Sequence, residues 1–294
     1  MLELVNYSIA FVVLVCASYV DLRIREVPDW LNYSAAAAGL SISLIYSVIF
    51  STPWPFIFSA AGAIFFLLIG LLMFYAGQWG GGDSKLLIAL GALFGLVFSS
   101  TFPFIILQQP LISFWINLLF VGVAYALCWS VYLAIKNKGE FRRQFLIITR
   151  EASRFKITII TLLVGSILTL VMIDNLSIKL PLLGAIIAIV TGTIMIVFAR
   201  AVEKSSMLKR VHPSKLTEGD WIAEDVYVGK KYVCGPKDLG IEKAQIKLLI
   251  SYARQRKIKT ILIKEGIPFV PSFLLAFLVT IKFGNLLFML LGLN

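Results

Sequence analysis

FIFSAAGAIFFLLIGLLMFYA, residues 56–76, is an apolar run without a single charged side chain. An α-helix rises about 1.5 Å per residue, so about 20 apolar residues cross a hydrocarbon core of about 30 Å. The run therefore predicts a membrane-spanning helix. The stretch GQWGGGDSKLL follows directly at residues 77–87 and holds one acid, Asp83, beside one base, Lys85. Because a charged group is costly at the edge of a bilayer, the role of Asp83 is the main question that the sequence raises.

The rest of the chain has the same apolar character. Of its 294 residues, 59% are hydrophobic, and the mean hydropathy is +0.90. This composition predicts an integral membrane protein with the fold class of an all-α polytopic helix bundle. The first apolar run lacks a basic n-region and a small-residue cleavage site, so we expect a retained span and no removed signal peptide. About eight spans are expected, at Leu4–Val20, Leu31–Phe50, Phe56–Ala76, Leu86–Ser100, Ile112–Ile135, Ile157–Ile173, Leu180–Ala199 and Phe269–Leu293.

Charge is distributed unevenly over the segments that connect these runs. The segment Asp21–Trp30 holds two arginines and the segment Lys136–Lys156 holds seven Lys or Arg, whereas STPWP and STFPFIILQQP hold no charge. The positive-inside rule places the basic loops and Gly77–Lys85 in the cytoplasm and the N-terminus outside. Membrane topology thereby accounts for the net charge of +11. We expect contact with membrane lipid and no nucleic-acid partner.

The segment from Arg200 to about Gly266 is polar and predicts a small α+β module on the cytoplasmic side. Extended runs are expected near DWIAEDVYV and KYVCG, then a helix over IEKAQIKLLISYARQRK with a basic exposed side, then TILIKEG. The expected organisation is a transmembrane core over 1–199, this module over 200–266 and a C-terminal span over 267–294.

Several chemistries are disfavoured by the residue inventory. The three cysteines, Cys16, Cys128 and Cys234, are scattered and form neither a disulfide framework nor a C-x-x-C metal site. His212 is the only histidine, so a serine–histidine relay or a site with two histidine ligands is not expected within one chain. We therefore expect no metal and no cofactor.

Two acids sit where the predicted spans meet the cytoplasm. Asp21 ends the first span and Asp83 begins the fourth, so the two share a membrane level. A helix cap is the simpler explanation for such an acid, and we prefer it for Asp29, which follows Pro28 at the start of a span. Asp21 instead ends a helix, where the macrodipole disfavours a negative charge. The glycines before Asp83 supply no bulk and permit unusual backbone angles, so another backbone could approach its carboxylate.

A pair of carboxylates brought together can hydrolyse an amide without a metal or a histidine. Like charges a few ångströms apart share a proton, so that one group activates a water and the other protonates the carbonyl oxygen. Lys85 would favour the ionised form of Asp83 or contact the substrate, or it would simply bind a lipid headgroup or a loop. An alternative is a transporter or channel subunit with an ion or proton path through Asp21, Asp83 and Lys85. A scaffold that docks a partner on the polar module would leave the aspartates unexplained.

Two motifs carry a resemblance to a known family. Gly80, Gly81, Gly82 and Asp83 match G-x-G-D, and DLRIREVPDWLNY, residues 21–33, is similar to a motif in which an aspartate ends a span before a basic loop. With these two motifs, the aspartate at 21 first and G-x-G-D second, the chain resembles the prepilin and preflagellin peptidases. These are intramembrane aspartic proteases, and the resemblance covers about residues 4–95. The resemblance implies that Asp21 and Asp83 are the catalytic pair. It also implies that the three glycines and Lys85 support the motif or bind substrate.

The resemblance is to the archaeal branch, because the chain lacks the bacterial insertion with paired C-x-x-C motifs. It implies cleavage without N-methylation. The implied substrates are precursors of pilins or archaellins with class III signal peptides, which have a short basic N-terminus, a cleavage site at the cytoplasmic face and then a retained apolar stretch. Glycines 80–82 would admit the extended peptide, and acids such as Glu26 or Asp29 would be needed to bind its basic end.

Overall fold

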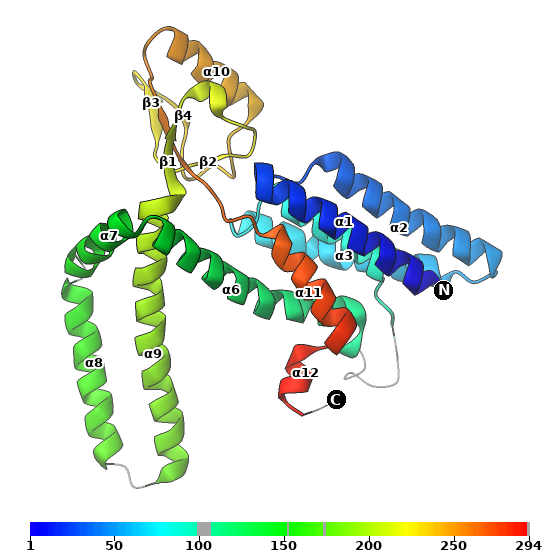
Figure 1. The fold of residues 1–294 in the computed structure, drawn as a ribbon, viewed down its shortest axis with the longest axis horizontal. Coiled ribbons are helices and arrows are strands. Elements are labelled where there is room, and N and C mark those ends of the chain that lie inside the picture. The colour runs from blue at the N-terminus through cyan, green and yellow to red at the C-terminus, as the bar shows by residue number, and fades with distance from the viewer. Residues whose placement is uncertain (99–106, 152, 173–174, 293–294) are drawn as a thin grey trace. The chain divides into compact units, whose positions relative to one another are not determined.

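The computed structural model describes residues 1–98, 107–151, 153–172 and 175–292. It is mostly helical, with several apolar helices, as expected of a polytopic membrane protein (Figure 1). The chain divides into two compact units. The first comprises residues 1–128, 212–261 and 266–294, and the second comprises 129–211 and 262–265.

The helices of the first unit are built around a short central one. That helix, α4 (Gly81–Phe94), packs against α3 (Trp54–Tyr75) and α2 (Asp29–Ile49). Close approach depends on glycines: a Cβ at Gly62 of α3 would lie 2.2 Å from the carbonyl oxygen of Gly91, and a Cβ at Gly91 would lie 2.3 Å from that of Gly62. Small residues that let backbones touch are typical of membrane helix pairs.

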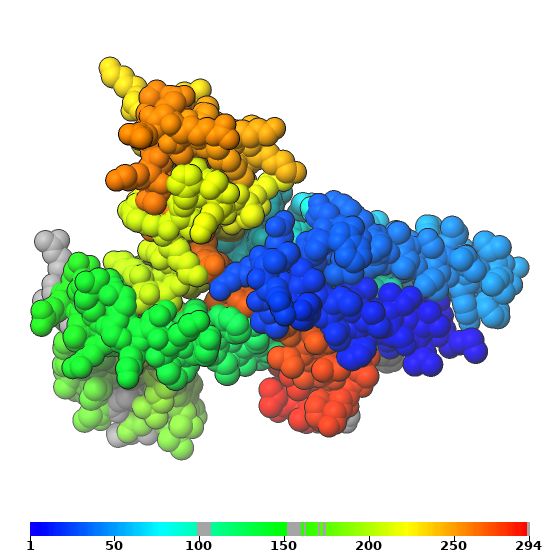
Figure 2. All heavy atoms as spheres, turned by 45° about the horizontal axis from the view of Figure 1, so that its top comes forward, coloured from blue at the N-terminus to red at the C-terminus, as the bar shows by residue number. Residues whose placement is uncertain are grey.

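The same unit joins the first helix of the chain to the last long one. Helix α1 (Leu2–Ile24) packs against α11 (Val270–Phe283), and α6 (Pro110–Lys136) lies between the two in the sequence. Figure 2 shows α1 in blue beside the orange and red side chains of the C-terminal helices. A buried apolar core joins these helices to α4, with Leu14, Leu90, Phe114 and Phe273 among its members.

The predicted last span is divided into two helices. α11 ends at Gly284, which has a φ of 68°, and Asn285 then caps the short helix α12 (Leu286–Leu290). Asn117 of α6 binds both sides of this break. Its Nδ2 donates to Thr280 Oγ1 at 2.9 Å and to the Gly284 carbonyl at 2.7 Å, and its Oδ1 accepts from Leu286 N at 2.9 Å.

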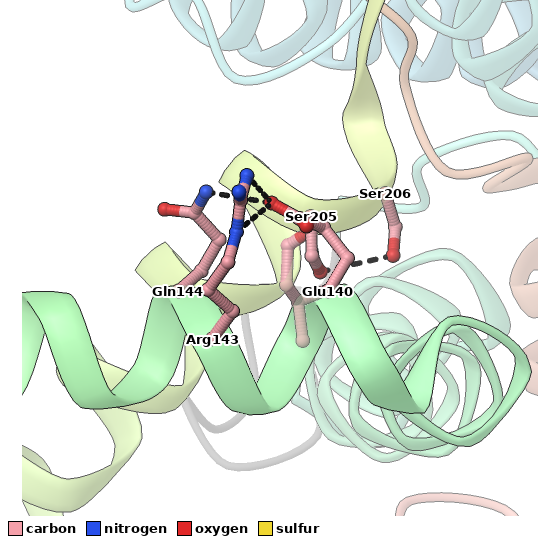
Figure 3. A network of polar contacts seen from close by, with 6 residues as sticks. Glu140, Arg143, Gln144, Ser205 and Ser206 are labelled. Atoms are coloured by element: carbon pink, nitrogen blue, oxygen red, sulfur yellow. Dashed lines mark hydrogen bonds and ion pairs between the residues drawn. The ribbon is translucent and has the colours of Figure 1, made fainter.

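The basic segment expected as a loop between the fifth and sixth spans contains a helix. This helix, α7 (Lys138–Glu151), packs with α9 (Leu176–Val202) in the second unit. The ring centres of Phe141 and Phe198 lie 5.5 Å apart there. At its start Glu140 accepts hydrogen bonds from Arg143 and Gln144, both at 2.7 Å (Figure 3). Expecting a loop was wrong, because the apolar residues Phe141, Phe145 and Ile148 recur at helical spacing among the charged ones and make this segment an amphipathic helix.

The remaining elements of the second unit continue this arrangement. Helix α8 (Ser153–Met172) packs with α9, and a five-residue π-turn, Glu203–Met207, follows α9. The hydroxyls of Ser205 and Ser206 in that turn lie 3.1 Å apart (Figure 3). Strand β1 (Leu208–Val211), which the sequence analysis did not anticipate, pairs with β5 (Ile261–Lys264).

The α+β elements predicted for the polar segment are present. They are β2 (Trp221–Ile222), β3 (Val226–Val228), β4 (Lys231–Cys234) and α10 (Lys243–Arg254). β3 and β4 form an antiparallel hairpin in which Val228 pairs with Lys231. A capping box between Glu242 and Gln245 starts α10.

Within the described residues, five helices are long and apolar enough to cross a membrane, namely α1, α2, α3, α6 and the helix that includes α9. The expected fourth and eighth spans correspond to the shorter helices α4 and α11, each of 14 residues. The number of crossings, the three-part division of the chain and the cytoplasmic location of the α+β module remain predictions.

Candidate active site

Asp21 lies in the last turn of α1 and is 4% exposed. Its Oδ2 accepts a hydrogen bond of 2.9 Å from the backbone N–H of Val270, the first residue of α11 and 249 positions away in the chain. The N-terminus of a helix carries partial positive charge and stabilises an anion. Asp21 is therefore unfavourable at the end of its own helix and favourable at the start of another, which the sequence analysis did not anticipate.

Asp83 lies in the first turn of α4 and is partly buried. It receives a backbone hydrogen bond from Gly80, the residue that caps the helix, and its carboxylate interacts electrostatically with that of Asp21. The structure thus places the two acids that the sequence analysis singled out near enough for their charges to interact. Each carboxylate also faces the N-terminal end of a helix, α11 for Asp21 and α4 for Asp83.

The three glycines before Asp83 have different surroundings. A Cβ at Gly82 would lie 3.2 Å from Val27 N, so the loop between α1 and α2 passes directly over this residue. A Cβ at Gly81 would lie 3.9 Å from the ring of Phe74, and one at Gly80 would meet no atom of the described residues within 4 Å. None of the three has a positive φ, so the unusual backbone angles that the sequence allowed here are not used; in this segment the positive φ, of 66°, belongs to Gly77.

Lys85 is paired with Asp29. Its Nζ lies 2.6 Å from Asp29 Oδ1 and 5.6 Å from the centre of the Tyr33 ring. Asp29 begins α2 but makes no side-chain cap, since the capping position is occupied by Pro28. The cap expected for Asp29 is therefore wrong. The structure gives Lys85 an ion pair that ties the start of α4 to the start of α2.

Asn32 makes a second tie between the same two helices. Its Nδ2 donates to the Gly82 carbonyl at 3.2 Å, and the residue is 1% exposed. The sequence analysis did not identify Asn32, because one amide side chain in an apolar run gives no pattern.

An aromatic cluster also joins the site to the C-terminal helix. Trp79, just before the glycines, has its ring 5.9 Å from those of Trp115 and Phe269 and 5.4 Å from that of Phe273. Neither Phe269 nor Phe273 was predicted as part of the site. No local motif marks them, since they lie in an ordinary apolar run far along the chain.

Known proteins share the part of the chain that contains both aspartates. Residues 8–130 match the type IV leader peptidase family. The chain is similar to a preflagellin peptidase of Methanococcus voltae, with 34% identity over 46% of this chain and 58% of that protein. It is also similar to a preflagellin peptidase of Methanocaldococcus jannaschii, with 36% identity over 31% of this chain and 38% of that protein.

A third relative is the prepilin peptidase EppA of Methanothermobacter thermautotrophicus, with 29% identity over 31% of this chain and 24% of that protein. The matched stretches thus span between 24% and 58% of these relatives. No solved structure matches the chain. The resemblance drawn from the two aspartate motifs is confirmed, since residues 8–130 match the type IV leader peptidase family and the similar proteins are archaeal preflagellin and prepilin peptidases.

Proposed function

We propose that this protein is a membrane aspartic endopeptidase that removes class III signal peptides from archaeal prepilin-like and preflagellin-like (archaellin) precursors. The observation that carries the proposal is the electrostatic interaction between Asp21 and Asp83, both of which lie inside the region that matches type IV leader peptidases. The names of the relatives, preflagellin peptidase and prepilin peptidase, indicate the class of precursor. Cleavage would occur at the cytoplasmic face, with the N-terminus outside and without methylation of the product.

In the proposed reaction the two carboxylates hold one proton between them. The ionised group removes a proton from water, whose oxygen attacks the carbonyl carbon of the scissile bond, and the other carboxyl group protonates the carbonyl oxygen. Breakdown of the tetrahedral intermediate breaks the C–N bond, and the departing nitrogen takes up a proton from the pair. The helix N-termini at Asp21 and Asp83 favour the single negative charge that this cycle needs.

The surroundings of the glycines suit an extended substrate. Space is open around Gly80, whereas Gly82 is covered by the loop at Val27. A peptide that approaches Asp83 along Gly80 and Gly81 would meet little side-chain bulk. The apolar stretch that follows the cleavage site would then pack against the apolar helices of the enzyme by van der Waals contact.

The alternative, an ion or proton path through the same residues, would use Lys85 as one of its charged groups. Lys85 is bound to Asp29 at 2.6 Å, which favours a structural role for this lysine. The peptidase needs only the two aspartates to meet.

The test is a cleavage assay. Membranes that contain the full chain are mixed with an archaeal pilin precursor, and the shorter product is followed by gel electrophoresis. Asp21→Asn and Asp83→Asn should each abolish the product, and Asp83→Glu should nearly abolish it, because an added methylene moves the carboxyl group by more than the roughly 0.5 Å that such sites tolerate. Asp29→Asn is the matched control and should retain at least part of the activity. Normal cleavage by either Asn variant of the pair would refute the proposal.

A further inference from the structure

The segment Gly266–Val270, which leads into α11 and is called the lead-in segment below, is bound to the end of α1 at two points. Arg25 Nη1 donates to the Gly266 carbonyl at 2.9 Å, and the Val270 N–H donates to Asp21 Oδ2 at 2.9 Å. Val270 is itself fully buried. The carboxylate of Asp21 is therefore held by a backbone group whose position is fixed by the start of a helix.

The lead-in segment also contacts the loop that carries Asp83. The Phe269 ring lies 5.9 Å from that of Trp79, which immediately precedes the glycines. On α6, a Cβ at Gly122 would lie 2.8 Å from Phe269 Cζ, so the ring packs directly against the helix backbone there. Two successive residues thus contact the two aspartate motifs: the backbones of Val270 and Phe269 both contact Asp21, and the Phe269 ring contacts the loop that carries Asp83.

We infer that the lead-in segment is a positioning element of the active site, with the Val270 amide as the group that orients Asp21 toward Asp83. The inference rests on the proposed peptidase function. Productive geometry in such sites must be held to about 0.5 Å, and α1 alone fixes only the backbone of Asp21. A donor on a second helix restricts the carboxyl group itself, and Phe269 holds the neighbouring loop from the same point.

This arrangement extends the active site beyond the region shared with the known family. The family match ends at residue 130, whereas Phe269 and Val270 belong to a segment that follows the α+β module. A contact of Asp21 is thus supplied by a part of the chain that lies outside the family match.

The decisive experiment removes the backbone donor at Val270. Val270→Pro in the full chain lacks the N–H, whereas Val270→Ala keeps it, and Pro271→Ala controls for disturbance of the helix start. Loss of a hydrogen bond to a charged group corresponds to about a tenfold to hundredfold effect. We expect Val270→Pro to lower kcat by that factor with KM nearly unchanged, because the amide contacts Asp21 and not the substrate. Val270→Ala and Pro271→Ala should retain most of the wild-type kcat.

Wild-type kcat in folded Val270→Pro, or an equal loss in Val270→Ala, would overturn the inference. Should Val270→Pro fail to fold, Phe269→Ala decides, with Phe283→Ala on the exposed end of α11 as its matched control. We expect the first to lower kcat and the second to leave it unchanged, and equal kcat values would overturn the inference.

A measurement without substrate separates this inference from the proposed function. Hydrogen exchange at the Val270 amide should be slow in the wild-type chain, faster in Asp21→Ala and unchanged in Asp29→Ala. Unchanged exchange in Asp21→Ala would refute the contact even if the protein cleaves precursors. Absence of cleavage by the wild-type chain would instead refute the proposed function. The hydrogen-exchange measurement would still decide whether Val270 contacts Asp21.

Discussion

Helices α4 and α9 are both apolar, yet they are packed in opposite ways. Eight of the 14 residues of α4 are buried, from Ser84 to Leu93. The helix that includes α9 is the most apolar of the five candidate spans, and 0% of its most apolar stretch is buried within the protein. Hydropathy alone therefore does not show which helix builds the core.

The difference reflects what surrounds each helix. A helix that faces lipid needs apolar side chains along its whole surface, whereas a helix that faces other helices can carry small and polar residues if each polar group has a partner. Helix α2, the least apolar of the five candidate spans, carries buried polar residues at Asn32, Ser43 and Ser47. Asn32 Nδ2 and Ser47 Oγ have hydrogen-bond partners, whereas Asn32 Oδ1 is buried without one among the described residues. The two candidate catalytic aspartates lie on α1 and α4, which have a weaker membrane signal than α3, α6 or α9.

The difference between α4 and α9 predicts opposite changes in stability when a glycine in each helix is replaced by alanine. Gly91→Ala in α4 places a Cβ 2.3 Å from the Gly62 carbonyl oxygen and must push α4 and α3 apart. We expect a loss of about 1–3 kcal/mol or more in the free energy of unfolding. Unfolding in detergent, followed by circular dichroism, measures it. Precursor cleavage should fall as well, because α4 carries Asp83.

The matched control is Gly192→Ala in α9, where a Cβ would meet no atom of the described residues within 4 Å. Alanine is the better helix former, so a gain of up to about 1 kcal/mol is expected. Similar changes in stability for the two variants would contradict the difference between the helices.

A smaller effect is expected from a buried amide. Asn117→Leu removes two donated hydrogen bonds and one accepted one at the break between α11 and α12, and leaves Leu286 N–H without its acceptor. An unsatisfied buried group costs about 1–3 kcal/mol. In contrast, Thr193→Val in α9 removes only a bond of 2.7 Å from the hydroxyl to the carbonyl of Ile189 in its own helix. Chemical denaturation of both variants should show the larger loss for Asn117→Leu, and equal losses would count against the comparison.

The smallest effect concerns ion pairs, for which the two units should behave alike. The side chains of Lys85 and Asp29 are 35% and 57% exposed, and those of Arg143 and Glu140 are 66% and 39% exposed. Double-mutant cycles on such pairs give about 0.2–1 kcal/mol. We expect couplings in this range for Lys85→Gln with Asp29→Asn and for Arg143→Gln with Glu140→Gln. A much larger coupling at Lys85 would show that this pair contributes more to the site than a surface contact does.

The sequence predicted the fold where apolar runs are continuous and failed where packing decides. The charge-free run 56–76 lies almost wholly within α3, and the extended runs expected near DWIAEDVYV and KYVCG contain the β3–β4 hairpin. The break at Gly284 was missed because the apolar run continues through it, and α7 was missed because its charges suggest a loop.

The residues of the candidate site likewise fall into those that a local motif predicts and those that only the packing of the fold reveals. Asp21 and Asp83 could be found because each lies in a local motif, and a motif needs no knowledge of the fold. The Val270 contact could not be found, since every residue except proline has a backbone N–H and nothing in the sequence marks the one that is used. The packing role of Gly82 was also beyond prediction, because it depends on where the Val27 loop passes.

The link between Asp21 and Val270 has a consequence for how the protein is made. A ribosome adds about 5–20 residues per second, so the 249 positions between the two represent roughly 10–50 s of synthesis. During that interval the acid at the end of α1 exists without its donor. The nascent chain therefore carries both aspartates long before it can hold the first in place, and this acid acquires its final surroundings only when the last long helix has left the ribosome.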